Sequence, residues 1–491
     1  MRRPNLLFIF TDEQRADTMA AYRNTLIDMP NLNRLGAESF VFERAYVTQP
    51  VCTPSRSSIL TGLWPHTNGC TSNNIRLPDE MPCLPELLPH GEYATAYHGK
   101  WHLGDELFAQ HGFDEWISIE DGYNKWFSAG HDPDTRSDYH RFLVGKGFAP
   151  QSGRTFGRSE AAHLPEAFGK PAFLAREASR FIRENRARPF CLFVNFLEPH
   201  MPFTGPRDGQ YDPARVTLPP NFENPPDDSQ PLRTRVLQRA YCEDGHGGMS
   251  LRTEADWRRL IANYWGLCSL VDTHVGTILA TLDECGLAGD TIVVYTSDHG
   301  DMMGSHRLLA KTVMFEEAVR VPLLVRLPGQ RVGRRVGGAI SQIDLVPTLL
   351  DLAAVSVSNH LQGTSGADVF RSGSPRAEGD VFVEWNGRAE GVRRYDATNA
   401  PPWLAELGSF DEIEAAMADS VRTIITPDGW KFNCSVRGEH ELYDLNADPY
   451  ETRNLARRAP NDETRGRMRD LADHIRRWQE RTEDVVTIPA I

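Results

Sequence analysis

Continuous apolar runs constrain the fold of this chain more than any other feature. They span residues 5–11, 93–97, 189–197 and 290–297 and hold few polar residues. Each has the length of a strand, and the lack of alternation is typical of strands buried on both faces of a parallel sheet. The sequence therefore predicts an α/β fold with a large mixed, mostly parallel sheet flanked by helices.

Each of these runs ends in side chains that can bind a metal or move a proton. The ends carry Asp12, then Lys100 with His102, then His200, then Asp298 with His299. In open α/β sheets, ligands bind beyond the carboxyl ends of the strands. One such ending could arise by chance. The complementary set predicts one sheet edge that carries a metal and proton-transfer groups.

A cysteine stands at the start of a predicted helix in residues 51–63, VCTPSRSSILTGL. Thr53 suits the cap and Pro54 the first helical position, and the apolar residues that follow continue the helix. The amide hydrogens and dipole of a helix start favour negative charge, and Arg56 adds a cation there. A single cysteine in such a place is more often only buried, so the longer motif carries the argument.

The motif C-x-P-S-R, followed by an apolar helix and Thr61-Gly62, resembles the signature of the type I, formylglycine-dependent sulfatases. That family belongs to the alkaline phosphatase-like superfamily. Residues 98–104, HGKWHLG, resemble a second motif of the family, and further motifs follow in order along most of the chain. The resemblance implies that Cys52 is oxidised to formylglycine (3-oxoalanine), whose hydrate supplies the nucleophilic oxygen.

The resemblance also implies one divalent cation near the modified cysteine. Its implied ligands are Asp12, Glu13, Cys52 after modification, Asp298 and His299. Glu13 stands where the family more often has Asp, so whether it ligates stays open, and His299 stands where many members have Asn. Hard oxygen ligands suit Ca²⁺ or Mg²⁺, and the histidine widens the choice toward Mn²⁺. The resemblance implies Ca²⁺.

The remaining roles are carried over from the family one residue at a time. Arg56, Lys100 and Lys311 are expected to neutralise sulfate oxygens. His200 is expected to contact the substrate and protonate the leaving oxygen. His102 is expected to assist breakdown of the sulfated intermediate. In an extended segment, Lys100 and His102 would project to the same side.

Residues 105–185 are rich in Gly, Asp and aromatic residues and show weak periodicity. We predict insertion loops over the site, where selectivity usually resides. Trp116, Tyr123, Trp126 and Phe127 could stack on a sugar or aryl group, but we expect them to pack beneath the loops. His66 is expected to be structural, and His246 receives no role.

The length and a composition change predict two domains. The chain has 491 residues, too many for one compact core. Residues 366–379 turn to Gly, Ser, Pro and charge, which is typical of a boundary. We predict a catalytic domain over 1–375 and a C-terminal α+β subdomain over 376–491, with a small antiparallel sheet and one covering helix.

The charge balance argues against several partners. The net charge is −14 with no basic block, which disfavours nucleic acid and anionic membranes and argues mildly against a long polysulfated polymer. The apolar run before Asp12 is too short to span a membrane and lacks a small-residue cleavage site. We read it as the first strand, which predicts a cytoplasmic protein.

Together these features predict a sulfuric ester hydrolase acting on a sugar, aryl or small alkyl sulfate monoester. Expected partners are a small sulfated substrate and a formylglycine-generating enzyme, and a homo-oligomer is possible. One alternative is a phosphonate monoester or phosphodiester hydrolase of the same superfamily, against which Lys100 and His102 argue. A remote alternative is a non-catalytic sulfated-ligand-binding protein, disfavoured because every expected catalytic position is filled.

Overall fold

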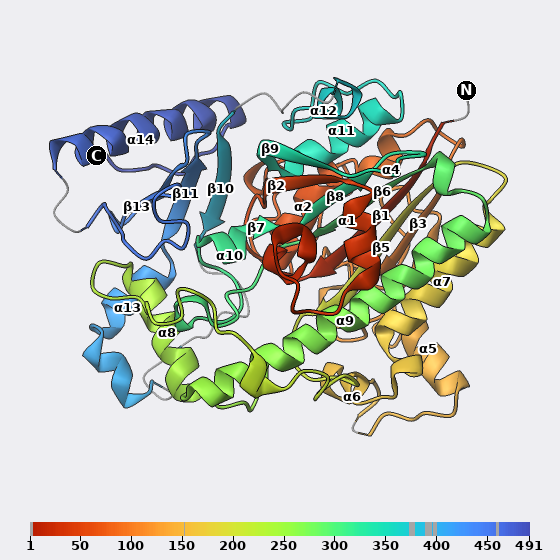
Figure 1. Cartoon of the computed structure of the whole chain (residues 1–491), viewed down its shortest axis with the longest axis horizontal. Coiled ribbons are helices and arrows are strands. Elements are labelled where there is room, and N and C mark those ends of the chain that lie inside the picture. Colours follow the sequence, from red (N-terminus) through yellow and green to blue (C-terminus); the bar gives the residue numbers. More distant parts are fainter. Residues whose placement is uncertain (1–2, 152, 373–378, 388–394, 396–399, 458–460) are drawn as a thin grey trace.

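The computed structural model describes residues 3–151, 153–372, 379–387, 395, 400–457 and 461–491. Two sheets organise these residues, a large one and a small one near the C-terminus (Figure 1). Helices cover both, so the predicted α/β class with a smaller α+β part is confirmed. The predicted boundary between residues 375 and 376 falls within residues 373–378, which lie outside the described residues.

The large sheet has nine strands among the described residues, in the order β4-β3-β5-β1-β6-β8-β2-β7, with β9 also paired to β2. In chain order the strands are β1 (Asn5–Asp12), β2 (Phe40–Tyr46), β3 (Ala94–Gly99), β4 (Glu115–Ile117), β5 (Phe190–Pro199), β6 (Thr291–Ser297), β7 (Arg320–Val321), β8 (Leu323–Arg326) and β9 (Arg334–Ser341). The pairs from β4 to β6 are parallel, whereas β8 is antiparallel to β6 and to β2. The sheet is therefore mixed and mostly parallel, as predicted.

Residues along β1 alternate between two apolar layers, as the pleat of a strand requires. Leu7 and Ile9 face a cluster that includes side chains of α1 (Pro30–Ala37), α7 (Lys170–Glu184) and α9 (Glu254–Glu284). Leu6, Phe8 and Phe10 face the opposite cluster. That second layer holds side chains of α2 (Cys52–Thr61), α4 (Leu84–Leu87) and α11 (Leu345–Leu352), and α3 (Pro65–Asn68) follows α2. Both faces are covered, which explains the unbroken apolar runs.

The prediction of loops over residues 105–185 is wrong for much of that range. It contains β4, α5 (Asp138–Gly145), α6 (Arg158–Ala162) and α7. Phe173, Leu174 and Phe181 of α7 are almost fully buried in the core. The helix packs beside α9 and against β5. Tertiary packing thus orders a segment whose Gly-rich surroundings hid a helical pattern.

The small sheet is antiparallel in the order β10-β11-β12-β13. Its strands are β10 (Val381–Asn386), β11 (Ser420–Ile425), β12 (Trp430–Ser435) and β13 (Glu441–Asp444). Helix α14 (Asp462–Thr482) covers one face, where Trp478 stacks on Phe382 at 5.0 Å between ring centroids. Nearby lie α8 (Leu232–Asp244), α10 (Glu316–Val319) and α13 (Phe410–Met417), whereas α12 (Ala367–Ser372) packs beside α11 and on β2 of the large sheet. The predicted sheet and covering helix are confirmed.

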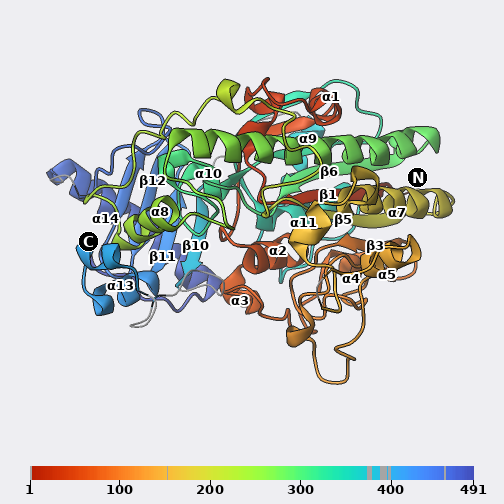
Figure 2. The same cartoon turned by 90° about the horizontal axis from the view of Figure 1, so that it is seen from below.

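Buried ion pairs and a shared apolar layer join the two sheets. Lys431 of β12 is fully buried and contacts Glu316 of α10 at 3.1 Å and Glu451 at 2.8 Å. Val383 and Trp385 of β10 belong to the same apolar cluster as Phe8. His66 has the structural role expected of it, because its ring contacts Glu384 of β10 at 2.5 Å. Helix α9 runs along the large part toward the small one (Figure 2).

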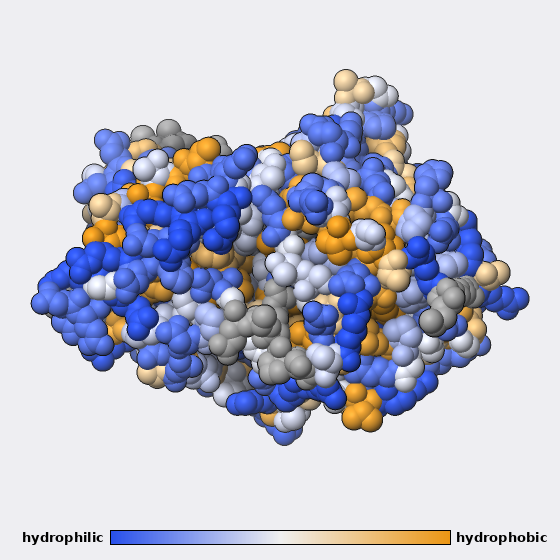
Figure 3. Space-filling model, turned by 90° about the horizontal axis from the view of Figure 1, so that it is seen from above, coloured by the Kyte–Doolittle hydropathy of each residue, from blue (hydrophilic) through white to orange (hydrophobic). Residues whose placement is uncertain are grey.

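The surface in one view is largely hydrophilic, with hydrophobic side chains gathered in separate patches (Figure 3). Val332 and Val485 are the most exposed of the large hydrophobic residues, at 79% and 91%. Among the described helices, none combines the length and apolarity needed to cross a bilayer.

Replacing Lys431 with Met should lower the free energy of unfolding by about 3–5 kcal/mol, because two buried carboxylates would lose their shared cation. Urea unfolding followed by fluorescence measures the change. Lys146→Met, at an exposed position, is the matched control and should change stability little. Equal midpoints for Lys431→Met and the wild type would contradict the structural role of this ion pair.

Candidate active site

The four parallel strands β3, β5, β1 and β6 are neighbours in the sheet, so their carboxyl ends meet at one edge. Asp12 is the last residue of β1, and Asp298 directly follows β6. Lys100 directly follows β3, and His200 directly follows β5. The structure therefore brings the predicted strand endings together.

Cys52 reaches this edge at the start of α2. The helix begins at Cys52 itself, with Val51 as the N-cap, and all ten of its residues are buried. Thr53 does not cap the helix as predicted, because it lies inside the first turn. Its hydroxyl instead donates to the carbonyl of His102 at 2.6 Å. Thr53 thus ties the cysteine helix to the Lys100–His102 segment.

Four potential metal ligands surround one point at the sheet edge. One ligand atom from each of Asp12, Cys52, Asp298 and His299 lies within 4.8 Å of the others, and all four residues are buried. The Cys52 Sγ lies 3.3 Å from His299 Nε2 and 3.7 Å from Asp12 Oδ1. These are the residues named from the sequence, with the exception of Glu13.

The His299 ring is oriented with Nε2 toward Cys52. Its Nδ1 lies 2.9 Å from the carbonyl of Gly300, so a proton on Nδ1 leaves Nε2 free to accept or ligate. Burial lowers the pKa of His299, but the nearby charges of Asp298 and Cys52 outweigh it and raise the pKa to about 9. The same negative charges would favour a cation bound at Nε2.

Glu13 lies beside this group rather than within it. Its carboxylate oxygens contact Lys311 Nζ at 3.0 Å and His200 Nε2 at 3.5 Å. A second cluster of potential ligands joins Glu13 to Asp12 and His200. Burial raises the pKa of Glu13 to about 8. Its backbone has φ of 74°, and its N–H donates to Asp298 Oδ1.

The Arg56 guanidinium is bonded to two buried carboxylates and does not face an open cleft. Its guanidinium donates to Asp12 Oδ2 and Asp298 Oδ2 at 2.8 and 2.9 Å. The remaining donors reach the Lys100 carbonyl and Asn195 Oδ1, both at 2.8 Å. Its side chain is fully buried. This geometry differs from the expected contact with sulfate oxygens and makes Arg56 a positioning residue.

The Lys100–His102 segment belongs to no helix or strand, and it is not the extended segment that we expected, because His102 is in a left-handed conformation. Gly99 has φ of 123°, and a Cβ there would lie 2.0 Å from the Asn195 carbonyl, so only glycine fits. His102 has φ of 60°. Lys100 Nζ bonds Asp12 Oδ2, whereas His102 Nε2 contacts Asn74 Oδ1 at 2.9 Å. The two side chains therefore take different directions.

Nearby positive charges lower the pKa values of Asp12, Cys52 and His200 at this sheet edge. Burial would raise the pKa of Asp12, but Lys100 and other nearby cations hold it well below its usual value. Burial and Asp12 also raise the pKa of Cys52, yet Lys100, Lys311 and His299 bring it below that of an ordinary thiol. Burial lowers the pKa of His200 well below its usual value, and Lys311 adds to this effect.

Several supporting residues were not identified from the sequence. Asn195 fixes Arg56, and Glu106 accepts the backbone N–H groups of Trp101 and His102 at 2.8 and 2.6 Å. Gln342 accepts from the Ser55 hydroxyl at 2.8 Å. Tyr123 was expected to pack under loops, but its ring centroid lies 4.8 Å from that of His102. Of these residues, only Glu106 had a signal in the sequence, because it lies close to the HGKWHLG motif.

The donor set fits a divalent cation. The ligand atoms of two carboxylates, one imidazole and Cys52 lie around one point. An oxygen in place of the Cys52 sulfur would give the set more of the hard ligands that Ca²⁺ and Mg²⁺ prefer. Both oxygens of buried Glu13 lack a well-directed hydrogen bond, which leaves them able to ligate. Mostly oxygen ligands suit Ca²⁺ or Mg²⁺, and the His299 nitrogen also admits Mn²⁺.

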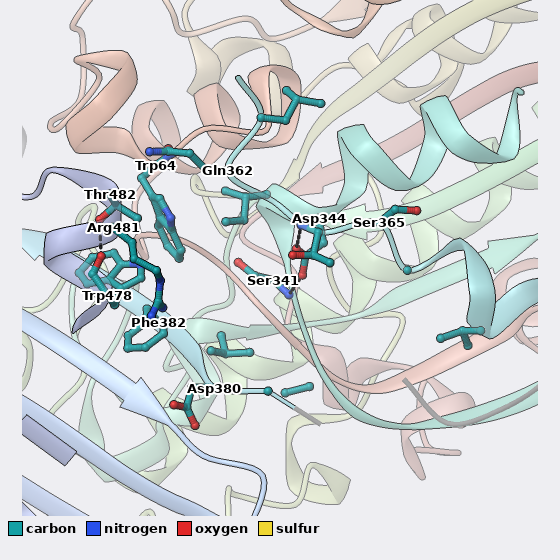
Figure 4. Close-up of a pocket in the computed structure, with 18 of the residues that line it drawn as sticks. Trp64, Ser341, Asp344, Gln362, Ser365, Asp380, Phe382, Trp478, Arg481 and Thr482 are labelled. Atoms are coloured by element: carbon teal, nitrogen blue, oxygen red, sulfur yellow. Dashed lines mark hydrogen bonds between the residues drawn. The ribbon is translucent and has the colours of Figure 1, made fainter. Parts of the chain in front are cut away.

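A cavity of about 650 Å³ lies away from this site. It is lined by residues that include Trp64, Asp344, Trp478 and Arg481 (Figure 4). None of the predicted catalytic residues lines it. The presence of a sizeable cavity therefore does not locate the chemistry of this protein.

The sequence matches the Sulfatase family over residues 4–355. The match covers most of the chain, which therefore belongs to this family and is a sulfatase of alkaline phosphatase-like fold. Choline-sulfatase of Rhizobium meliloti is 29% identical and aligns over 94% of this chain and 84% of its own length. Arylsulfatase of Clostridium perfringens is 27% identical, with 92% and 90% covered.

Solved structures share the same fold. Phosphonate monoester hydrolase SpPMH from Silicibacter pomeroyi superposes with a TM-score of 0.78, at 22% identity, over 98% of this chain and 96% of that one. The structure of BT4656 in complex with its substrate D-glucosamine-2-N,6-O-disulfate has a TM-score of 0.74, at 22% identity, over 99% of both chains. At such identities the likeness shows the fold alone.

Replacing Arg56 with Lys should remove the hydrogen bond to one of the two buried carboxylates, because one ammonium cannot reproduce the planar fork. We expect a loss of about 3–5 kcal/mol in unfolding free energy. Added Ca²⁺ should also raise the unfolding midpoint less than in the wild type. Urea unfolding with and without Ca²⁺ measures both effects, and exposed Arg331→Lys serves as the control. Wild-type stability and calcium response in Arg56→Lys would refute the positioning role.

Proposed function

We propose that this sulfatase hydrolyses a sulfate monoester of a sugar, aryl or small alkyl alcohol, with formylglycine derived from Cys52 and one divalent cation. The observation that carries the proposal is the position of Cys52. Its Sγ lies within 3.7 Å of both Asp12 and His299. Lys100, Lys311 and His200 surround Asp12 closely enough to hold its pKa down.

The cation would be held by Asp12, Asp298 and His299, with residue 52 beside it and Glu13 as a further candidate. When bound, it supplies positive charge that polarises the sulfate and favours an anionic nucleophile. Hydrated formylglycine supplies the hydroxyl that acts as this nucleophile. Ca²⁺ is the favoured ion because the set is mostly hard oxygen.

The two lysines would neutralise the sulfate oxygens. Burial lowers the pKa of Lys311, but the nearby anions outweigh this effect and raise it above its ordinary value, so Lys311 stays charged. Lys100 stays charged in the same way beside Asp12. Buried ammonium groups stabilise a charged transition state more strongly than groups in water do. Arg56 would act through the carboxylates that it orients.

His200 and His102 would handle the protons. The His200 Nδ1 lies 2.8 Å from the Met201 carbonyl, and Nε2 faces Glu13 at the site. The Nδ1 contact with a carbonyl turns Nε2 toward the site, and Nε2 would donate a proton to the leaving alcohol oxygen once the ring is protonated there. His102 Nε2 contacts Asn74, and this imidazole could accept a proton when the resting residue at position 52 is restored.

The alcohol half of the substrate stays open between three chemical classes. Named relatives include a choline-sulfatase, an arylsulfatase and an N-acetylglucosamine-6-O-sulfatase. A phosphonate monoester substrate is the alternative, because a site for tetrahedral oxyanions also fits phosphoryl groups and a phosphonate hydrolase shares the fold. Lys100 and His102 favour sulfate. The proposal also requires a formylglycine-generating enzyme as a partner.

Replacing Cys52 with Ala should lower sulfate release by more than about a thousandfold, because the nucleophile can no longer form. Sulfate release is measured on 4-nitrophenyl sulfate after co-expression with a formylglycine-generating enzyme. Intact mass should show oxygen in place of sulfur at residue 52 of the wild type only. The partly buried Cys285→Ala is the control.

The same protein distinguishes the alternatives. Faster turnover of phenyl phosphonate monoesters than of matched aryl sulfates would favour a phosphonate hydrolase. Full turnover by Cys52→Ala would end the formylglycine proposal altogether.

Replacing His200 with Gln should slow hydrolysis of an alkyl or sugar sulfate by about 10²–10⁴-fold, because an alkoxide needs a proton to leave. The loss on 4-nitrophenyl sulfate should be much smaller, since nitrophenolate is a stable leaving group. The ratio of kcat/KM values on the two substrates is the measurement, and exposed His360→Gln is the control. Equal losses on both substrates would contradict a proton-donor role.

A further inference from the structure

Arg158 begins α6, within the residues that the sequence presented as loops. We propose that Arg158 binds an acidic substituent on the leaving alcohol, so that the substrate is a small sulfated sugar with a second anionic group. A carboxylate and a second sulfate share the required chemistry. The inference rests on the proposed function and names the substrate class of the same site.

The contacts of Arg158 connect it to the catalytic histidines. Its Nη2 donates to the Tyr123 hydroxyl at 2.9 Å. The Tyr123 ring lies against His102, with 4.8 Å between the centroids. Arg158 and His200 also line one small cavity of about 30 Å³. The charge of Arg158 contributes to the lowered pKa of His200, so Arg158 lies close to the proposed proton donor.

One edge of the guanidinium is held in place and the other is available. Nε and Nη2 bond Glu120, which also accepts from Lys170 Nζ at 2.7 Å. Within the described part of the chain, Nη1 makes no hydrogen bond, and the side chain is 30% exposed. A fixed guanidinium with a free Nη1 is suited to bind a carboxylate or sulfate oxygen.

The local charge balance favours an anion. Two cations, Arg158 and Lys170, share the single carboxylate of Glu120. Glu198 and Glu166 line the same small cavity. Burial raises the pKa of Glu198 to about 7, so it offsets only part of this charge near neutral pH, and Glu166 is paired with Arg207. The surplus positive charge would attract an acidic group and repel a quaternary ammonium.

The whole protein limits the size of this substrate. Its net charge of −14 repels a long polyanion. A local surplus of positive charge can still hold one small dianion, since the charges act within a few ångströms. A monosaccharide or short oligosaccharide with one extra acidic group satisfies both conditions.

Matched sugar sulfates test the proposal. One pair is D-glucosamine-2-N,6-O-disulfate with D-glucosamine-6-sulfate, and another is a sulfated glucuronate with the corresponding sulfated glucose. The wild type should prefer the acidic member of at least one pair, and the preferred pair distinguishes a second sulfate from a carboxylate. Arg158→Met should lower kcat/KM for that substrate about 10- to 100-fold, mainly through KM.

Controls separate a substrate contact from a structural role. Arg158→Met should lower kcat/KM for 4-nitrophenyl sulfate much less than for the acidic sugar, because that substrate has no second acid and Lys170 still pairs Glu120. Arg158→Lys should restore part of the preference. Arg154→Met, on the same segment with a side chain 79% exposed, should change nothing. A wild type without preference, or equal losses on all substrates, would overturn the proposal.

A binding experiment keeps this test separate from catalysis. Calorimetry compares D-glucosamine-2-N,6-O-disulfate and its 6-sulfate on Cys52→Ala protein, with and without Arg158→Met. We expect the preferred acidic sugar to lose about 10- to 100-fold in affinity when Arg158 is absent. Unchanged affinity for both acidic sugars would refute the subsite even in an active sulfatase. Absent turnover with Arg158-dependent binding would instead refute the proposed reaction.

Discussion

One buried guanidinium holds together the ends of four strands. Arg56 donates to Asp12 on β1, to Asp298 after β6, to the Lys100 carbonyl after β3 and to Asn195 on β5. A charge removed from water is stable only with close partners, so these groups depend on one another. The sheet edge is consequently rigid, and it fixes the positions of the side chains around Cys52.

The fold and the place of the site followed from local patterns. The unbroken apolar runs at Leu6–Phe10 and Ile292–Tyr295 reflect burial on both faces, which a sequence displays directly. Parallel strands place their carboxyl ends at one edge. The terminal residues of four runs could therefore be assigned to one site without knowledge of any contact.

The contacts themselves could not be read from the sequence. The partners of Arg56 depend on which strands are neighbours in the sheet. The hydrogen bond from Thr53 to His102 likewise joins segments that are distant in the sequence. Helix α7 was missed because its Gly- and Asp-rich surroundings weaken the periodic signal. Tyr123 and Arg158 come from the same segment. Their nearness to the histidines depends on how that segment folds back over the sheet.

The burial of α2 has a consequence for how active molecules arise. Cys52 is only 2% exposed, and the whole helix around it is enclosed. Under the proposed function, a formylglycine-generating enzyme would have no access to this thiol once the sheet and helices have packed. Oxidation would then compete with folding during synthesis, and the ratio of the two rates would set the active fraction. A molecule that folded first would stay inactive.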